Sequence, residues 1–91
     1  MIRSVNVIIA GRVQRVGYRH WVDRHARRMG LGGWVRNLQD GSVEAVFSGS
    51  AKKVQDMIEL CFEGPSLAKV IDITASPAAP PTETGFILYR D

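Results

Sequence analysis

The chain alternates between stretches with the period of a β-strand and stretches with the period of an α-helix. The first such stretch, residues 5–10, is apolar at every position except Asn6, so a strand formed here would be apolar on nearly both faces. Strands buried on both faces lie in the interior of a sheet. We therefore predict a central β-strand over residues 5–10.

Two later segments have the spacing of amphipathic helices. The first covers residues 21–29, and Gly30 is a suitable C-cap for it. The second begins at Ser50, a good N-cap, and ends near Gly64-Pro65. The apolar positions that would face the core are Tyr18, Val22, Ala26 and Met29 in the first helix and Val54, Met57, Ile58 and Cys61 in the second.

Residues 34–38 and 42–47 alternate between apolar and polar positions, and Asp40-Gly41 lies between them. An Asp-Gly pair between two alternating segments is a strong signal for a β-hairpin, because its residues tolerate the positive φ angles of a tight turn. We predict that these two strands pair antiparallel. Asp40 and Glu44 are assigned to the hairpin rather than to a site.

Two further strands are predicted at residues 70–74 and 85–90, joined by a stiff, proline-rich surface loop over residues 75–81. The full order is strand, helix, strand, strand, helix, strand, strand. Right-handed crossovers make this a ferredoxin-like split βαβ sandwich of the α+β class. We expect one domain over residues 1–91, with an antiparallel sheet, two helices on one face, and a short strand added to the βαββαβ core.

Composition narrows the possible partners and compartments. The 91 residues carry a net charge of +3, which favours anionic ligands but does not separate a phosphorylated metabolite from nucleic acid. The single cysteine, Cys61, excludes an internal disulfide framework and favours a reducing cytoplasm. No stretch is long and apolar enough to be a signal peptide or a membrane span. We expect a cytoplasmic monomer.

The turn at residues 11–19 has the composition of an anion-binding site. It connects the first strand to the first helix and contains two glycines and three arginines. The first amides of a helix have no intrahelical partner, and the helix dipole places partial positive charge beside them. Taken alone, such a turn is more often an ordinary basic connector.

Three segments together change that balance. The sequences of residues 11–19, 30–37 and 40–44 closely resemble the acylphosphatase family, including both of its signature segments at the expected separation. The resemblance extends over essentially the whole chain. It implies an enzyme that needs no metal or cofactor and hydrolyses the carboxyl–phosphate bond of a small-molecule acyl phosphate to a carboxylate and inorganic phosphate.

The resemblance also implies roles for individual residues. Arg19 matches the phosphate-binding arginine of the family, and Asn37 matches the asparagine that positions the attacking water. The expected phosphate cradle consists of the backbone amides of Arg15, Val16, Gly17, Tyr18 and Arg19. Arg15 stands where many members have glycine, so a positive φ there would carry a strain of about 1 to 2 kcal/mol and would be visible as a backbone outlier.

The chemistry fits this small set of groups. The leaving carboxylate has a conjugate acid with a pKa of about 4, so no general acid is required at neutral pH. Arginine offers a planar, permanently charged pair of donors to two phosphate oxygens. Asparagine can orient a water without adding negative charge beside the phosphoryl group. We hypothesise that a phosphate oxygen of the substrate takes the proton of the water.

Other interpretations remain. A ferredoxin-like sheet with basic charge is also typical of RNA-binding modules, but the predicted central strands lack paired aromatic platforms. A second alternative is an anion-sensing or maturation domain without catalysis. His20 and His25 lie at different angles around the helix and are expected to face solvent rather than to bind a metal. Trp34 is expected in the core or at its rim.

Overall fold

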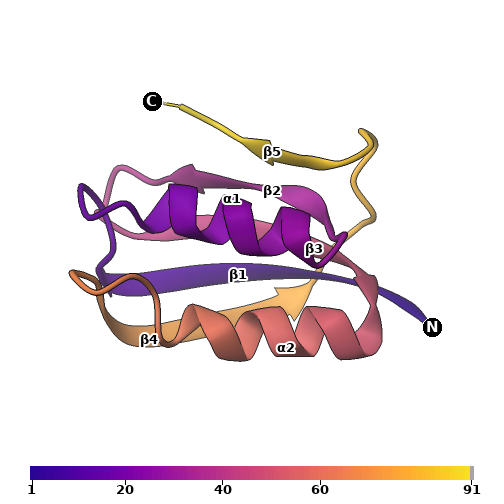
Figure 1. Cartoon of the computed structure of the whole chain (residues 1–91), viewed down its shortest axis with the longest axis horizontal. Helices are drawn as coiled ribbons and strands as arrows, with labels where there is room; N and C mark the ends of the chain where they lie inside the picture. Colours follow the sequence, from indigo (N-terminus) through magenta and orange to yellow (C-terminus); the bar gives the residue numbers. More distant parts are fainter. Residues whose placement is uncertain (91) are drawn as a thin grey trace.

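The computed structural model describes residues 1–90, which form five β-strands and two α-helices in the predicted order (Figure 1). The strands are β1 (Ile2–Arg12), β2 (Gly32–Asn37), β3 (Val43–Ser50), β4 (Lys69–Pro77) and β5 (Phe86–Leu88), and the helices are α1 (Tyr18–Arg28) and α2 (Ala51–Cys61).

The strands form one sheet in the order β4-β1-β3-β2-β5. β1 is an interior strand, as predicted, and lies between β4 and β3, although its fully buried residues lie on one face only. β2 and β3 form the predicted antiparallel hairpin. The added strand β5 pairs parallel with β2, so the sheet is mixed rather than wholly antiparallel. The reason is topological. β4 and β2 run in opposite directions, so β4 finishes at the same end of the strands at which β2 starts. The connecting loop then crosses from the β4 edge of the sheet to the opposite edge without running back along the strands, so β5 begins beside the start of β2.

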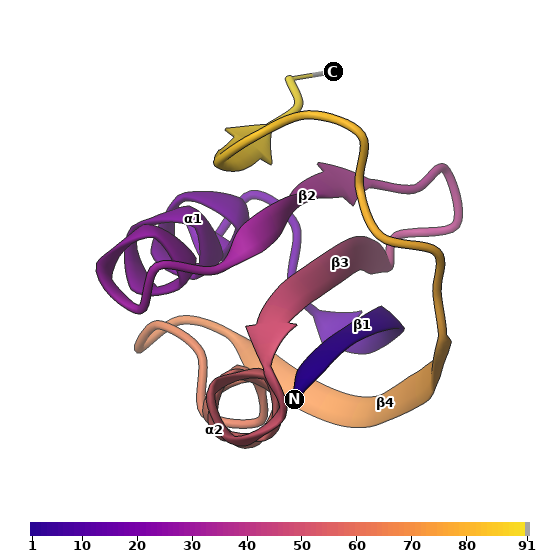
Figure 2. The same cartoon turned by 90° about the vertical axis from the view of Figure 1, so that its right-hand side faces the viewer.

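Both helices cover the same face of the sheet, and α1 lies nearer β2 and β5 while α2 lies nearer β1 and β3 (Figure 2). The core fills the space between these two layers. It is built mainly from the inward positions of the strands and from the predicted helix stripes, including Cys61. The fully buried strand residues include Val7 and Ile9 of β1, Val35 of β2 and Phe47 of β3.

Several boundaries differ from those expected; β1 is longer at both ends, and β5 is limited to Phe86–Leu88. Two of the differences concern the predicted site and the predicted proline-rich loop. α1 begins at Tyr18 rather than at Trp21, which places Arg19 in the first turn of the helix. β4 continues through Pro77, so the first part of the predicted proline-rich loop is strand. β4 is an edge strand, and a proline at the end of an edge strand removes a backbone donor where the sheet can tolerate the loss.

Candidate functional site

A bulge at the end of β1 starts the turn that leads into α1. The pairing of β1 with β4 shifts register between Ala10 and Gly11. Gly11 has a φ of 130°, and a Cβ atom there would lie 2.1 Å from the carbonyl oxygen of Lys69. Only glycine fits this close approach. Pairing continues after the bulge to Arg12, and the turn that contains the predicted cradle follows.

The turn itself contains two residues in the left-handed region, Arg15 with a φ of 63° and Gly17 with a φ of 80°. Arg15 is the one non-glycine residue of the described chain with a positive φ. The sequence left the conformation of this position open, and the structure shows that it has the positive φ that would make it a backbone outlier. A side chain in this conformation costs about 1 to 2 kcal/mol, so the rest of the turn must hold Arg15 in place.

Gly17 is the N-cap of α1, and no side chain caps this helix. The first intrahelical bond runs from the amide of Trp21 to the carbonyl oxygen of Gly17, at 3.0 Å. The amides of residues 18–20 therefore have no acceptor within the helix, and they point out of its N-terminus with the positive end of the helix dipole. This is the geometry of an anion site.

A cavity of about 210 Å³ opens at this helix terminus, and Asn37 lies in its wall. Four of the predicted cradle residues line it: Arg15, Gly17, Tyr18 and Arg19. The fifth, Val16, packs its side chain against the core instead. The remaining lining residues are Val13 and His20. The fold therefore brings Arg19 of α1 and Asn37 of β2 to one cavity.

Arg19 is half-buried, and its Nη1 donates a hydrogen bond to the carbonyl oxygen of Tyr89 at 2.6 Å. This bond ties the guanidinium group to the segment that follows β5. Asn37 is the last residue of β2, and its side chain points to the same side of the sheet as buried Val35. Its Oδ1 atom is buried and accepts no hydrogen bond within residues 1–90, while the residue makes other contacts.

Gln14 links the turn before α1 to the hairpin turn after Asn37, a role that the sequence analysis missed. Its Nε2 donates to the carbonyl oxygens of Leu38 and Ser42, at 2.7 and 2.8 Å. These acceptors belong to the hairpin turn that follows Asn37. Gln14 is the one amide side chain among the glycines, arginines and valines of residues 11–17, and this was the available signal.

The hairpin turn is braced by its own polar groups. The Asp40 carboxylate accepts hydrogen bonds from the amide of Ser42 at 2.9 Å and from its hydroxyl at 2.5 Å. These bonds lower the pKa of Asp40. The amide of Leu38 donates to the carbonyl oxygen of Ser42 at 2.9 Å. Asp40 therefore belongs to the hairpin, as predicted.

Tyr18 anchors the turn from below. Its ring is buried, and its hydroxyl donates to the carbonyl oxygen of Cys61 at 2.6 Å. Burial raises the pKa of Tyr18, so its hydroxyl stays protonated and keeps donating. Burial also raises the pKa of the Cys61 thiol to about 12, as expected for a core cysteine.

The histidines of α1 differ in their surroundings. His20 is exposed, as predicted, and also lines the rim of the cavity. His25 is half-buried against Trp21, with 4.5 Å between ring centroids, so it faces solvent less than expected. Burial, with help from Arg28 and Arg24, lowers the pKa of His25. Within residues 1–90, no group of three histidine, cysteine, aspartate or glutamate side chains is placed to hold a metal ion, and no helix is long and apolar enough to cross a membrane.

Comparison with known proteins shows the family of the chain. The family model described as Acylphosphatase matches residues 5–88. An acylphosphatase of Acidiphilium cryptum is 48% identical over 82 residues, which covers 90% of each chain. The acylphosphatase structure of Bacillus subtilis superposes with a TM-score of 0.92 at 32% identity and covers 99% of this chain and 100% of that one. The structure of T. kodakarensis HypF aligns with a TM-score of 0.82 and 32% identity over 98% of this chain but only 12% of that one. This chain belongs to the acylphosphatase family.

Proposed function

We propose that this acylphosphatase hydrolyses the carboxyl–phosphate bond of its substrate in the cavity between the N-terminus of α1 and Asn37. The main support for the proposal is that three features line one cavity. They are the uncapped N-terminus of α1, the half-buried Arg19 of that helix, and Asn37 of β2. Each feature alone is common, but together they can hold a phosphoryl group and a water molecule at once.

The phosphoryl group is bound by the amides of residues 15–19 and by the guanidinium group of Arg19. The left-handed φ angles of Arg15 and Gly17 curve the backbone of this segment around the cavity. The bond from Arg19 to the carbonyl oxygen of Tyr89 fixes one Nη atom, which leaves the fork oriented before substrate arrives. Preorganised donors stabilise the transition state without reorganising during the reaction.

Asn37 orients the attacking water in this proposal. Its Oδ1 atom is a neutral acceptor in the cavity wall opposite the turn. An aspartate in its place would repel the phosphoryl oxygens. Asparagine is too weak a base to deprotonate water, so a phosphoryl oxygen of the substrate accepts the proton while the P–O bond to the carboxylate breaks.

The remaining parts of the proposal follow from this division of roles. The carboxylate departs without a general acid, and neither a metal ion nor a cofactor takes part. The substrate is a small-molecule acyl phosphate, and neither a nucleic acid nor a membrane is a partner. A single domain, working as a monomer, carries the activity. A buried free thiol at Cys61 is in keeping with a cytoplasmic enzyme.

Phosphate release from benzoyl phosphate in the presence of a metal chelator tests the proposal. We expect turnover by the intact protein, and we expect Arg19→Ala and Asn37→Ala each to lower kcat/KM by about a hundredfold to a thousandfold. Inorganic phosphate should still inhibit or bind Asn37→Ala, but should bind Arg19→Ala poorly. Equal phosphate affinity in the two variants would contradict the division of roles.

Matched controls are available for both substitutions. Arg24 is an exposed arginine of α1 that does not line the cavity, so Arg24→Ala should keep near-normal turnover. Asn6 lies on the opposite face of the sheet and donates to Glu44 at 2.9 Å, so Asn6→Ala should also remain active. Phosphate binding without any turnover in the intact protein would favour the anion-sensing alternative.

A further inference from the structure

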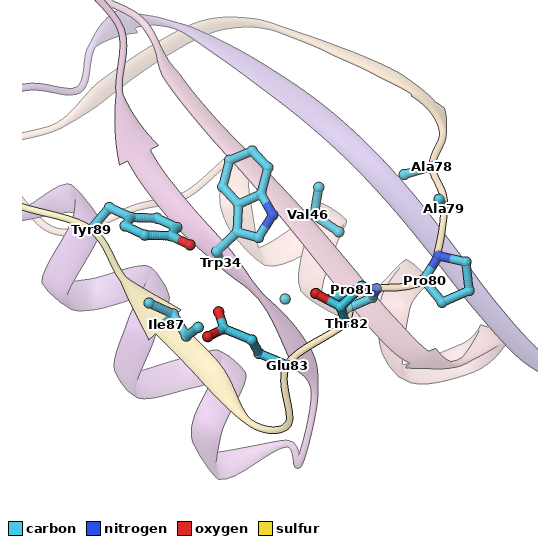
Figure 3. A pocket seen from close by; sticks show the side chains of 11 residues that line it. Trp34, Val46, Ala78, Ala79, Pro80, Pro81, Thr82, Glu83, Ile87 and Tyr89 are labelled. Carbon is cyan, nitrogen blue, oxygen red and sulfur yellow. The ribbon is translucent and has the colours of Figure 1, made fainter.

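A second cavity, of about 370 Å³, lies on the face of the sheet opposite the helices (Figure 3). Trp34 of β2 and Val46 of β3 form its floor, since they are cross-strand partners whose side chains point away from the side of buried Val35. The loop between β4 and β5 forms its wall. None of its lining residues lines the catalytic cavity, so it is a separate pocket.

Two aromatic rings meet at one end of this pocket. Trp34 and Tyr89 pack edge to face, with 6.1 Å between ring centroids and an interplanar angle of 68°. Arg36 already rests over the Trp34 ring at 5.1 Å, but it lies outside the pocket lining and is neutralised by Glu44 at 2.6 Å. The Trp34 indole therefore already holds one cation in this structure, and the same side chain lines the pocket.

Glu83 supplies the charge of the pocket. It is the one ionisable residue other than Tyr89 in the lining, and its carboxylate points into the space shared with Trp34 and Tyr89 (Figure 3). Within residues 1–90, Glu83 forms neither an ion pair nor a side-chain hydrogen bond. Glu83 is exposed at the mouth of the pocket, and its carboxylate has no charged partner among the described side chains.

We propose that this pocket binds a small, free organic cation whose ammonium nitrogen carries alkyl groups. The aromatic corner and Glu83 would surround the positive nitrogen, while Pro81, Ile87 and Val46 would contact the alkyl groups. A bare metal ion would need several oxygen ligands, and the pocket offers one carboxylate. An anion would be repelled by the carboxylate of Glu83. Aromatic rings with a nearby carboxylate are the chemistry that recognises an alkylated ammonium group.

Titration with choline, followed by the indole N–H signals in a ¹H–¹⁵N spectrum at constant ionic strength, tests the proposal. The chain has two tryptophans, so Trp34→Phe assigns the two signals. We expect the Trp34 signal to shift saturably. The neutral isostere 3,3-dimethyl-1-butanol has the same shape without the charge, and we expect it to bind at least about tenfold more weakly.

Glu83→Gln keeps the size of the side chain and removes its charge. We expect this variant to bind choline at least about fivefold more weakly and to hydrolyse benzoyl phosphate normally, which shows that it is folded. No shift at about 100 mM choline, or equal binding of choline and the neutral alcohol, would overturn the proposal. So would binding to phosphatidylcholine vesicles without binding of free choline, because the proposed ligand is a free molecule.

Discussion

The two helices begin in opposite ways, although each has 11 residues and neither has an acidic residue in its first turn. α2 starts from Ser50 in an extended conformation, and the serine hydroxyl accepts a hydrogen bond from the amide of Lys53 at 3.3 Å. α1 starts from Gly17 in the left-handed conformation, with no side chain to cap it. The N-terminus of α2 is therefore capped by a side chain, whereas the N-terminus of α1 is not.

The comparison shows that positive charge alone does not make an anion site. Lys52 and Lys53 lie in the first turn of α2. The Lys52 ammonium group, however, pairs with Asp56 at 3.2 Å, and the backbone amide of Lys53 donates to the hydroxyl of Ser50. At α1 the backbone amides, Arg19 and a cavity coincide. A glycine N-cap is less stable than a serine cap by only a few tenths of a kcal/mol. The left-handed conformation of Arg15 adds about 1 to 2 kcal/mol, so the turn before α1 must be stabilised by contacts from elsewhere.

Gln14 provides such contacts, and removing it should have the largest effect among the changes that spare Arg19 and Asn37. We expect Gln14→Ala to lower kcat about tenfold with little change in KM, because the turn and the Asn37 strand would no longer be held in register. Benzoyl phosphate kinetics measure this split. Gln14→Glu should not rescue kcat, since a carboxylate cannot donate to the two carbonyl oxygens it would face.

The control for Gln14 is Gln55, an exposed glutamine of α2 that donates to Glu59 at 3.1 Å. Gln55→Ala should leave both kinetic constants unchanged. If Gln14→Ala lost thermal stability but kept its kcat, Gln14 would be a structural residue only, and the comparison between the two helix termini would lose its functional part.

Ser50→Ala should have the next effect, on stability alone. Removing the cap of α2 is expected to lower the free energy of unfolding by about 1 kcal/mol, whereas kcat/KM should stay within twofold of the intact protein. Urea unfolding and the phosphate-release assay measure the two quantities. Ser66→Ala, at an exposed serine outside both helices, is the matched control. Loss of activity at constant stability would show that the N-terminus of α2 also serves the reaction.

Much of the fold was predictable because local signals agreed with one another. The alternating pattern predicted the β2–β3 hairpin, and the apolar sequence of β1 predicted an interior strand. Ser50 was predicted to cap α2 and does so. The parallel pairing of β5 was not predictable in this way. It depends on how the loop after β4 crosses the sheet to the opposite edge, and that is set by long-range packing rather than by any local pattern.

The same distinction between local patterns and long-range packing applies to the residues of the site. The motif resemblance predicted Arg19 and Asn37 as site residues and singled out Arg15 as a departure from glycine, and all three line the cavity. The bridging role of Gln14 was not predictable, because it depends on the distance in space between its side chain and the hairpin turn. Spacing along the sequence does not give that distance. The aromatic pocket with Glu83 likewise exists only because a loop folds over the open face of the sheet.

Arg15→Gly should have the smallest effect and is the most informative about the uncapped N-terminus of α1. Glycine adopts a φ of 63° freely, which removes a strain of about 1 to 2 kcal/mol, but its greater freedom in the unfolded chain offsets about 0.5 to 1 kcal/mol of that. We expect a net gain in the free energy of unfolding of at most about 1.5 kcal/mol. The lost charge should raise KM about threefold or less at low salt, and this effect should shrink as salt is added. Thermal unfolding and kinetics at two salt concentrations measure both. A loss of turnover as large as that of Arg19→Ala would instead make the Arg15 guanidinium group part of the phosphoryl site, and the backbone would no longer account for the cradle by itself.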